Sequence, residues 1–432
     1  MKASFFKTVD IAPLVVFRIF FGFLIACESF GAIATGWVKN VLITPQFTFS
    51  FIGFEWLQPL PGNGMYYYFL AMGILGLLIM FGLRYRIAIF SFSILWTGVY
   101  LMQKSSYNNH YYLLMLISYI MIFLPANRYH SLDIKWGFIK EKKVVPYWIN
   151  CIFIIQIAIV YFYASVAKIY PDWLDGTFTK NLLQGTTSNP FFLEIFANKW
   201  FYLFIAYAGI LYDLFIIPLL LYKKTRTLAL IASLCFHLFN AIVLQIGIFP
   251  FFALSFALFF YEPDTIRKLF FRKKEPVLTQ SNNYNQKYNW YYLFIPYLII
   301  QSLLPLRHYF IKGDVLWTEE GHRLSWRMML RERSGHISFE VIENSTQQRM
   351  LYDYTKNLSY KQARQLPVKP DFIWQYCQKI KQEYKGKDIS IYIRCENSIN
   401  RKPYQLLIDP NYDMAKAKWN YFFHNEWLLD YN

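Results

Sequence analysis

Apolar stretches of about the length of a membrane-spanning helix recur through the first 306 residues of the chain. Such a helix needs roughly 20 predominantly apolar residues, and nine stretches come near that length. The chain is 56% hydrophobic and only 16% charged, which is too apolar for a soluble protein of 432 residues. The sequence therefore predicts a polytopic α-helical membrane protein with about nine transmembrane helices. They begin near Ile11, Met65, Arg86, Tyr111, Trp148, Trp200, Thr227, Gly247 and Trp290, and end near Ala32, Leu83, Met102, Pro125, Val166, Tyr222, Val243, Tyr261 and Leu306.

The positive charges of the connecting loops predict how these helices are oriented. Lys and Arg accumulate on the cytoplasmic side of a membrane. With a cytoplasmic N-terminus, eighteen of them fall in the inner segments 2–7, 84–86, 128–143, 223–226 and 267–287. Only five fall in the outer loops, namely Lys39, Lys104, Lys168, Lys180 and Lys199. The formal net charge of +17 thus reflects membrane orientation, and nucleic-acid binding is not expected.

Residues 307–432 have a different composition. They hold 20 Lys and Arg against 15 Asp and Glu, and no apolar run among them is long enough to cross a membrane. Alternating apolar side chains predict strands over 336–343 and 389–396, and the stretch 372–386 predicts an amphipathic helix closed by Gly386. We expect a transmembrane helical domain over residues 1–306 and an extracytoplasmic, β-rich α+β domain over residues 307–432.

Motifs that identify common enzyme classes are missing from the sequence. It contains no CxxC, HExxH, Walker loop, GxSxG or dinucleotide fingerprint, so metal, nucleotide and classical hydrolase chemistry are not expected. Cys27, Cys151 and Cys235 fall in apolar stretches and are interpreted as small apolar residues. Cys377 and Cys395 both fall in the C-terminal domain, where a disulfide between them is left open.

Several polar side chains lie inside or at the ends of the apolar stretches. Lys168 closes the fifth stretch on the outer side, and Asn109 and His110 begin the fourth stretch on the same side. His237 and Asn240 lie about ten residues, or roughly 15 Å, along the seventh stretch, which starts inside. These side chains are expected to converge in the outer half of the bilayer. Because each is costly near lipid, several at one depth point to function.

Each of these residues also has a simpler interpretation. Lys168 can be a lysine that anchors a helix end at the membrane surface, with its ammonium in the headgroup region. His110 can be an interfacial residue among tyrosines. His237 and Asn240 lie on one helix face, where an amide can simply bridge two helices by hydrogen bonding.

Arg18 and Asp213 are further charged residues inside apolar stretches. We expect them, and Asn240, to have structural roles as partners of other polar groups. Taken together, the polar residues favour a proton-transfer site that opens to the outer leaflet. A lysine that is partly desolvated loses its proton more easily, and neighbouring His and Asn side chains can hydrogen-bond an oxyanion.

Several segments of the chain match one known family in order. They are SSYNNHYYL, VYFYASVAKIYPDWLDG, GILYDLF and CFHLFNAIVLQIGIF, followed by LSWRMMLRERS and LLIDPNYDMAKAKW. The chain resembles the vitamin K-dependent gamma-glutamyl carboxylase family, in particular its bacterial homologues with an HTTM domain. The resemblance begins at Val16, Phe17 and Arg18 and runs almost to the C-terminus.

The resemblance implies that reduced vitamin K is oxygenated to its 2,3-epoxide while a peptide glutamate is carboxylated to gamma-carboxyglutamate. In the family, an active-site lysine deprotonates reduced vitamin K, and oxygen addition gives a strong base that removes a γ-proton before carbon dioxide adds. The family's lysine falls on Lys168, its Asn-Asn-His histidine on His110 beside Asn109, and its Phe-His-x-x-Asn histidine on His237. Oxygen and carbon dioxide are the implied co-substrates and no metal is implied, with menaquinol the expected quinol in a bacterium.

The resemblance also implies a binding site for the peptide in the C-terminal domain. The family's substrate segment begins Ser-Trp, which falls on Ser325 and Trp326, and Arg331 and Arg333 follow as partners for a substrate carboxylate. The animal enzyme has a histidine where Arg331 stands, and Arg364 matches a further basic contact. Solvated charges on strands are the alternative interpretation of these arginines.

The sequence ends at Asn432, whereas the animal enzyme continues with a lumenal region that engages propeptides, so propeptide recognition is not expected. Three functions remain open. The first is an integral-membrane gamma-carboxylase that acts on a glutamate-containing peptide. The second is a quinol epoxidase or quinone-handling membrane protein without carboxylation. The third is a non-enzymatic receptor or transporter, although no internal repeat typical of transporters is present.

Overall fold

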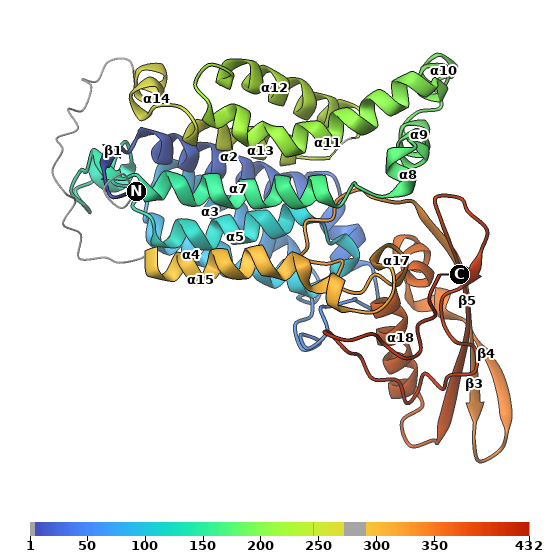
Figure 1. Cartoon of the computed structure of the whole chain (residues 1–432). Helices are drawn as coiled ribbons and strands as arrows, with labels where there is room; N and C mark the ends of the chain where they lie inside the picture. Colours follow the sequence, from blue (N-terminus) through green and yellow to red (C-terminus); the bar gives the residue numbers. More distant parts are fainter. Residues whose placement is uncertain (1–4, 245, 272–290, 432) are drawn as a thin grey trace.

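The computed structural model describes residues 5–244, 246–271 and 291–431, which form a helical bundle followed by a sheet-containing region (Figure 1). Five helices are long and apolar enough to cross a membrane: α2 (Ala12–Ala34), α3 (Gly64–Phe81), α4 (Tyr85–Met102), α7 (Trp148–Val166) and α11 (Lys199–Leu221). Shorter helices are α5 (Asn109–Phe123), α12 (Arg226–Ile242), α13 (Phe249–Ser255) with the 3-10 turn Phe256–Phe259, and α15 (Tyr291–Leu303). Each expected stretch thus contains a helix, and within the described residues five of these helices reach spanning length. The start expected near Trp290 and parts of the basic segments 2–7 and 267–287 lie outside the described residues.

Shorter elements close the ends of the bundle. They are α6 (Leu132–Lys135), α8 (Pro171–Leu174), α9 (Thr177–Gln184), α10 (Pro190–Ala197) and α14 (Pro263–Phe270), with strands β1 (Thr8–Asp10) and β2 (Val144–Pro146) paired antiparallel. At this β1–β2 end, Arg267 forms a buried ion pair with Asp10, and its Nη1 donates to the Tyr129 hydroxyl at 2.7 Å. Arg18 donates to the carbonyl oxygens of Ala126 and His130 at 3.0 and 2.9 Å. Arg18 therefore binds the turn that follows α5, the kind of contact expected of a structural ion.

Small residues bring α2 and α3 into close contact. A Cβ added to Gly22 would lie 2.3 Å from the backbone nitrogen of Met80, and one added to Gly76 would lie 2.8 Å from that of Ala26. Only glycine permits this approach, which maximises van der Waals packing between apolar helices. The left-handed Gly82, with φ of 65°, then ends α3.

The C-terminal region is built on a four-stranded antiparallel sheet in the order β4-β3-β5-β6. Its strands are β3 (Arg333–Glu343), β4 (Gln348–Tyr352), β5 (Ile389–Ile399) and β6 (Gln405–Leu406), accompanied by α16 (Val315–Thr318), α17 (Tyr360–Gln365) and α18 (Pro370–Glu383). The strands expected over 336–343 and 389–396 are confirmed, with Phe339 opposite Ile393 and Val341 opposite Ile391, and α18 is the helix expected between them. Cys377 and Cys395 are buried, free thiols, so the structure contains no disulfide between them.

The sheet region lies beyond one end of the bundle, and the N-terminus lies at the other end (Figure 1). The junction has an apolar part, where the ring of Phe49 stacks on that of Phe372 with centroids 4.2 Å apart. It also has an ionic part, because Asp371 at the start of α18 bonds Lys104 at 2.6 Å and Arg323 at 3.1 Å. The two regions therefore share one packed interface.

Replacing Asp371 with asparagine is expected to destabilise this junction. Burial alone would raise the pKa of the Asp371 carboxyl, but the charges of Arg323 and Lys104 outweigh it and hold the pKa at about 2. Because an unfolded aspartate titrates near 3.9, the charged form adds about 2–3 kcal/mol of stability above that pH, which is lost as the pH falls through about 2. Thermal unfolding in detergent should show a lower unfolding temperature for Asp371→Asn at pH 7 and a smaller difference below pH 4. The stabilising role of the Asp371 charge would be contradicted if the difference in unfolding temperature did not change with pH. It would also be contradicted if replacing the exposed Asp388 with asparagine had an equal effect.

Candidate functional site

A large, mostly apolar cavity lies where α7, α11 and α12 approach the sheet end of the bundle. Its volume is about 510 Å³, and its wall is mostly aromatic and aliphatic. Lys168, His110, His237, Asp213 and Asn240 all line it. The expected convergence of polar groups is thus present in the structure, and it includes Asp213, for which the sequence predicted only an unspecified partner.

Lys168 and Asp213 form the polar centre of this cavity. Lys168 follows the last turn of α7, where its backbone nitrogen donates to the Ser165 carbonyl oxygen at 3.0 Å. Its ammonium forms a hydrogen-bonded ion pair with the carboxylate of Asp213 on α11, and both residues are buried. The ring of Trp173 lies 5.5 Å from the Lys168 Nζ. A lysine that only anchors a helix at the membrane surface would point to water, whereas this one points inward to a carboxylate.

Two histidines flank the cavity from different helices. His237 on α12 is buried, and its Nε2 lies 3.0 Å from the Tyr161 hydroxyl and 3.2 Å from the Tyr212 hydroxyl. The ring of His110, at the start of α5, stacks on Phe249 with centroids 3.7 Å apart. The sequence did not single out Tyr161 and Tyr212, because two hydroxyls are hard to distinguish among 35 tyrosines.

Asn109 does not line the cavity, although it was expected beside His110 in the site. Its Nδ2 donates to the carbonyl oxygen of Arg327 at 3.0 Å, and its Oδ1 accepts from the Tyr107 hydroxyl at 3.0 Å. The Tyr107 hydroxyl in turn accepts from the backbone nitrogen of Leu324 at 2.8 Å. Asn109 thus links the bundle to residues 319–331, which we call the connecting segment.

The connecting segment runs from the end of α16 to β3 and forms part of the cavity wall through Met328 and Met329. Glu319, Leu324, Trp326 and Met329 have φ values of 61°, 60°, 57° and 48°, a left-handed conformation that is unfavourable for residues other than glycine. Trp326 is buried against Tyr112, with ring centroids 4.9 Å apart, rather than exposed for a substrate. The segment is therefore held in a strained shape by its contacts with the bundle.

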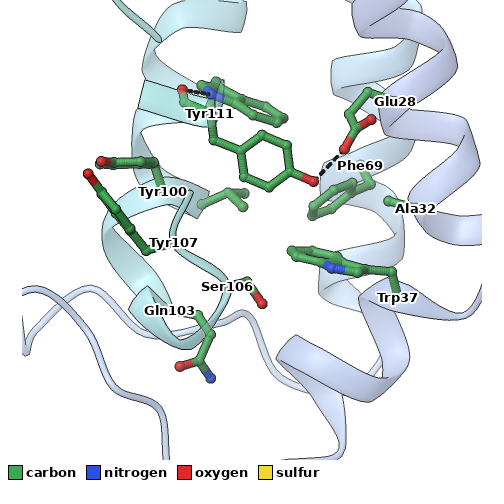
Figure 2. A pocket seen from close by; sticks show the side chains of 11 residues that line it. Glu28, Ala32, Trp37, Phe69, Tyr100, Gln103, Ser106, Tyr107 and Tyr111 are labelled. Carbon is green, nitrogen blue, oxygen red and sulfur yellow. Dashed lines mark hydrogen bonds between the residues drawn. The ribbon is translucent and has the colours of Figure 1, made fainter. Parts of the chain in front are cut away.

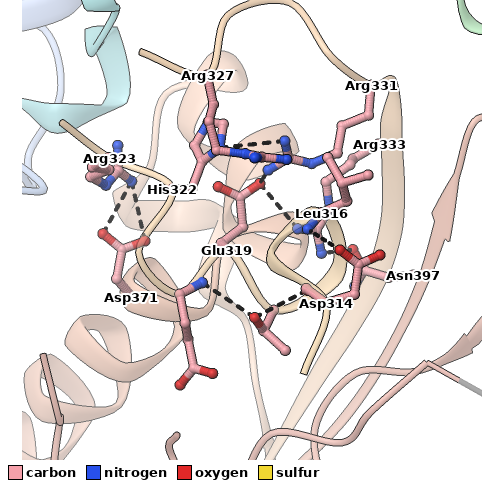
Figure 3. Close-up of polar contacts among 12 residues, drawn as sticks. Asp314, Leu316, Glu319, His322, Arg323, Arg327, Arg331, Arg333, Asp371 and Asn397 are labelled. Atoms are coloured by element: carbon pink, nitrogen blue, oxygen red, sulfur yellow. Dashed lines mark hydrogen bonds and ion pairs between the residues drawn. The ribbon is translucent and has the colours of Figure 1, made fainter. Parts of the chain in front are cut away.

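Arg331 and Arg333 lie together, but a carboxylate of the chain itself already binds them (Figure 3). Glu319 forms an ion pair with Arg331 and a second one with Arg333 at 3.1 Å. Burial would raise the pKa of Glu319, but Arg331, His322 and Arg333 hold it well below its usual range. The arginines are thus not the solvated strand charges of the alternative interpretation, and they do not line the cavity described above.

Arg364 lies apart from these arginines. It is an exposed residue of α17, and its guanidinium lies 5.8 Å from the centroid of the Tyr360 ring. Among the residues that the structure describes, no contact joins it to Arg331 or Arg333. Arg364, expected as a further basic contact, is thus separate from the Arg331 and Arg333 pair.

A second, much smaller cavity lies between α2 and α5 (Figure 2). Its volume is about 20 Å³, enough for roughly one water molecule. The Tyr111 hydroxyl donates to the Glu28 carboxylate there at 2.5 Å, while Trp37 and Phe69 enclose the pair. The Glu28 carboxylate thus has a hydrogen-bond partner, and the cavity around it is too small for an organic ligand. Glu28 is therefore separate from the candidate site.

The residues of the large cavity suit the binding of an organic ligand with polar atoms at one position. Across the described ranges, no group of three or more His, Cys, Asp or Glu side chains is arranged to hold a metal ion. The polar groups instead include one ion pair, two imidazoles and the Asn240 amide in a mostly apolar wall. Such a site can transfer protons to and from an apolar molecule that carries hydroxyl or carbonyl groups.

Two family models match the chain, and together they cover most of it. The HTTM domain matches residues 6–265, and the lumenal domain of vitamin K-dependent gamma-carboxylase matches residues 286–432. No solved structure matches the chain. The first match covers α2 to α13 with most of the cavity wall, and the second covers α15, the connecting segment with Met328 and Met329, and the sheet. The chain therefore belongs to the vitamin K-dependent gamma-carboxylase family.

Proposed function

We propose that this protein is an integral-membrane gamma-carboxylase that oxygenates reduced vitamin K to its 2,3-epoxide and carboxylates glutamate in a peptide. The observation that carries the proposal is the buried Lys168–Asp213 pair in an apolar cavity that His110 and His237 also line. Membership of the family supplies the reaction, and the cavity supplies a place where its first proton transfer can occur.

A quinol is a suitable ligand for this cavity. A volume of about 510 Å³ lies within the range of typical small-molecule sites, and the aromatic wall suits a flat, apolar ring system. When bound and oxygenated, reduced vitamin K supplies the strong base that abstraction of a glutamate γ-proton requires. The expected physiological form in a bacterium is menaquinol.

The Lys168–Asp213 pair can act as one proton acceptor. Whether the shared proton is on the amine or on the carboxyl, arrival of one more proton gives the same product, an ammonium beside a neutral carboxyl. The pair then carries a positive charge next to the anion that the proton has left. In a cavity of low polarity, this attraction is stronger than it would be in water.

We further propose that residues 1–306 form the membrane domain, with about nine spans and a cytoplasmic N-terminus, and that residues 307–432 are extracytoplasmic. The position of the N-terminus and the sheet at opposite ends of the bundle supports this orientation (Figure 1). Exposed apolar side chains on the outer helix faces, including Tyr67, Ile87 and Leu228, are suited to lipid.

The peptide is proposed to bind near the connecting segment, with Arg331 and Arg333 attracting the substrate carboxylate. Replacing either arginine with alanine should reduce peptide carboxylation several-fold more than epoxide formation, because only the peptide uses them. Rates of label incorporation and of epoxide release, measured on the same preparation, check this. Arg349→Ala, which removes an exposed arginine of β4, serves as the control. Equal loss of both activities in the Arg331 and Arg333 variants would mean that the arginines serve folding.

A quinol epoxidase without carboxylation is the second candidate, and one observation favours it. Glu319 already occupies the two arginines, so an incoming glutamate has to displace a bound carboxylate. The quinol half-reaction is common to both candidates and can be tested alone. Purified protein given reduced vitamin K and oxygen should release the epoxide, detected by chromatography. Absence of epoxide from folded protein would contradict both candidates.

A further inference from the structure

A polar cavity lies at the junction between the bundle and the sheet region, and we call it the junction cavity. Its volume is about 140 Å³, and its wall includes Lys104, Arg307 and Arg323. Of the described residues, none lines both this cavity and the large apolar one. The connecting segment contributes to both, because its first half lines the junction cavity while Met328 and Met329 line the other. A ligand in the junction cavity would therefore contact the segment that forms part of the wall of the large cavity.

The carboxylates that line the junction cavity already have partners in the chain (Figure 3). Asp371 forms ion pairs with two cations, and so does Glu319. Glu320 accepts two hydrogen bonds from Asn425, at 2.8 and 2.7 Å, and its other oxygen lies 2.8 Å from the His424 Nδ1. Each of the three acids is thus satisfied without a ligand, whereas the ion pairs of Asp371 and Glu319 each leave one positive charge in excess.

Arg307 adds a positive charge that no carboxylate of the described chain binds. It lies in the 3-10 helix Leu304–Phe310, and its Nη2 donates to the backbone carbonyl oxygen of Arg323 at 2.6 Å. Among the residues that the structure describes, no Asp or Glu forms an ion pair with it. The guanidinium is therefore held in the cavity wall by a neutral carbonyl group, and its charge can attract an anion.

Lys369 supplies a further positive charge beside the cavity. Its Nζ lies 4.8 Å from the centroid of the Phe372 ring, which the Lys104 and Arg323 cations approach to 5.3 and 5.7 Å. Within the described ranges Lys369 forms no ion pair. Burial, and next the charge of Arg323, lower the pKa of the Lys369 amine to about 7. The ammonium form is thus disfavoured here, and an anion in the cavity would stabilise it.

The junction cavity has the size and wall of a site for a small organic acid. Counted with the two arginines that bind Glu319, six Lys and Arg side chains lie in or next to it, against the three carboxylates that line it. A guanidinium binds a carboxylate through parallel N–H groups. Phe51, Ile52 and Trp419 form an apolar part of the wall, against which a short aliphatic chain can pack.

We propose that the junction cavity binds a carboxylate-type anion, with Arg307 and Lys369 supplying positive charge that the acids of the chain do not neutralise. The site itself rests on the cavity and its charges. Its two sources of ligand, an acidic side chain of the peptide and bicarbonate, rest on the proposed function. A peptide acid held there would fix the peptide against the connecting segment, which also carries Arg331.

The test measures the affinity of glutarate for the full-length protein in nanodiscs of neutral lipid, without quinol, by saturation-transfer NMR. Arg307→Gln removes the charge but keeps an N–H for the Arg323 carbonyl oxygen, so Kd should rise about tenfold, and Arg307→Lys should recover most of this loss. Lys369→Gln should raise Kd by about threefold. Arg349→Gln, which removes an exposed arginine of β4, is the matched control and should bind as the wild-type protein does.

A second arm distinguishes the two sources of the carboxylate. A glutamate-containing peptide that displaces glutarate, when its glutamine counterpart does not, identifies an acidic side chain as the ligand. Line broadening of 13C-labelled bicarbonate, in the absence of glutarate binding, identifies the dissolved ion. Binding has to weaken in Arg307→Gln in either arm, or in Lys369→Gln if the first variant does not fold. Absence of binding in both arms, or binding that these changes leave unaltered, would overturn the proposal. If the protein binds the anion but forms no epoxide, the proposed function fails and the site remains.

Discussion

Replacing Lys168 with methionine is expected to reduce epoxide formation by at least about a hundredfold, because a positioned general base typically contributes that much or more. Methionine keeps the length and apolar body of the side chain but cannot take a proton. Asp213 remains in the variant without its cationic partner. Of the Lys168–Asp213 pair, only this carboxyl group in an apolar cavity is then left to accept a proton. Initial rates with saturating reduced vitamin K measure the effect.

The matched control for this prediction is Lys180→Met. Lys180 belongs to α9, close to residues of the cavity wall, but does not itself line the cavity. This variant should keep a rate close to that of the wild-type protein. Retention of more than about half of the wild-type rate by Lys168→Met would remove Lys168 from the proposed mechanism.

Replacing Asp213 with asparagine is expected to impair both stability and catalysis. Loss of one partner from a buried ion pair leaves an uncompensated charge, which typically costs about 3–5 kcal/mol. The carboxylate is also half of the proposed proton acceptor, so the rate should fall by about tenfold or more. Thermal unfolding in detergent and the epoxide assay measure the two effects separately.

A double variant separates these two roles of the pair. Lys168→Met combined with Asp213→Leu removes both charges, so the unfolding temperature should recover toward the wild-type value, while activity should remain as low as in Lys168→Met alone. Asp213→Asn protein with the wild-type rate would show that the carboxylate has only a structural role. Failure of the double variant to recover stability would show that the pair is not the source of the loss.

Much of the fold could be predicted because apolar length and alternation are local signals. Each expected apolar stretch contains a helix, and both expected strands are present with the amphipathic helix between them. The number of helices that cross the membrane could not be obtained in this way. Among the described residues five helices reach spanning length, and hydropathy alone does not tell which of the shorter ones, such as α13, cross the membrane.

Residues of the cavity could be singled out from the sequence, but not their pairings. Lys168, His110 and His237 were expected near one level of the bundle, and all three line one cavity. The partner of Lys168 depends on how α11 is rotated against α7, and that rotation is set by packing rather than by local sequence. For the same reason Asn109, which neighbours His110 in sequence, binds the connecting segment instead of lining the cavity.

The ion pairs that Arg331 and Arg333 form with Glu319 could not be predicted either. Glu319 lies 12 and 14 residues before them, and it reaches them only because the connecting segment turns back through several left-handed residues. Such conformations are rare outside glycine, so no sequence pattern predicts them at Glu319, Leu324 or Trp326. A carboxylate so far away in sequence gives no local signal of pairing.

One protein is proposed to couple oxygenation of a quinol in the cavity to carboxylation of a peptide. Purified protein should be given reduced vitamin K, oxygen, labelled bicarbonate and a glutamate-containing peptide, with epoxide and peptide label followed in the same reaction. Both products should form, and both should be lost in Lys168→Met. Epoxide without label would contradict carboxylation and leave the epoxidase function, and label or epoxide that persists without Lys168 would contradict the proposed site.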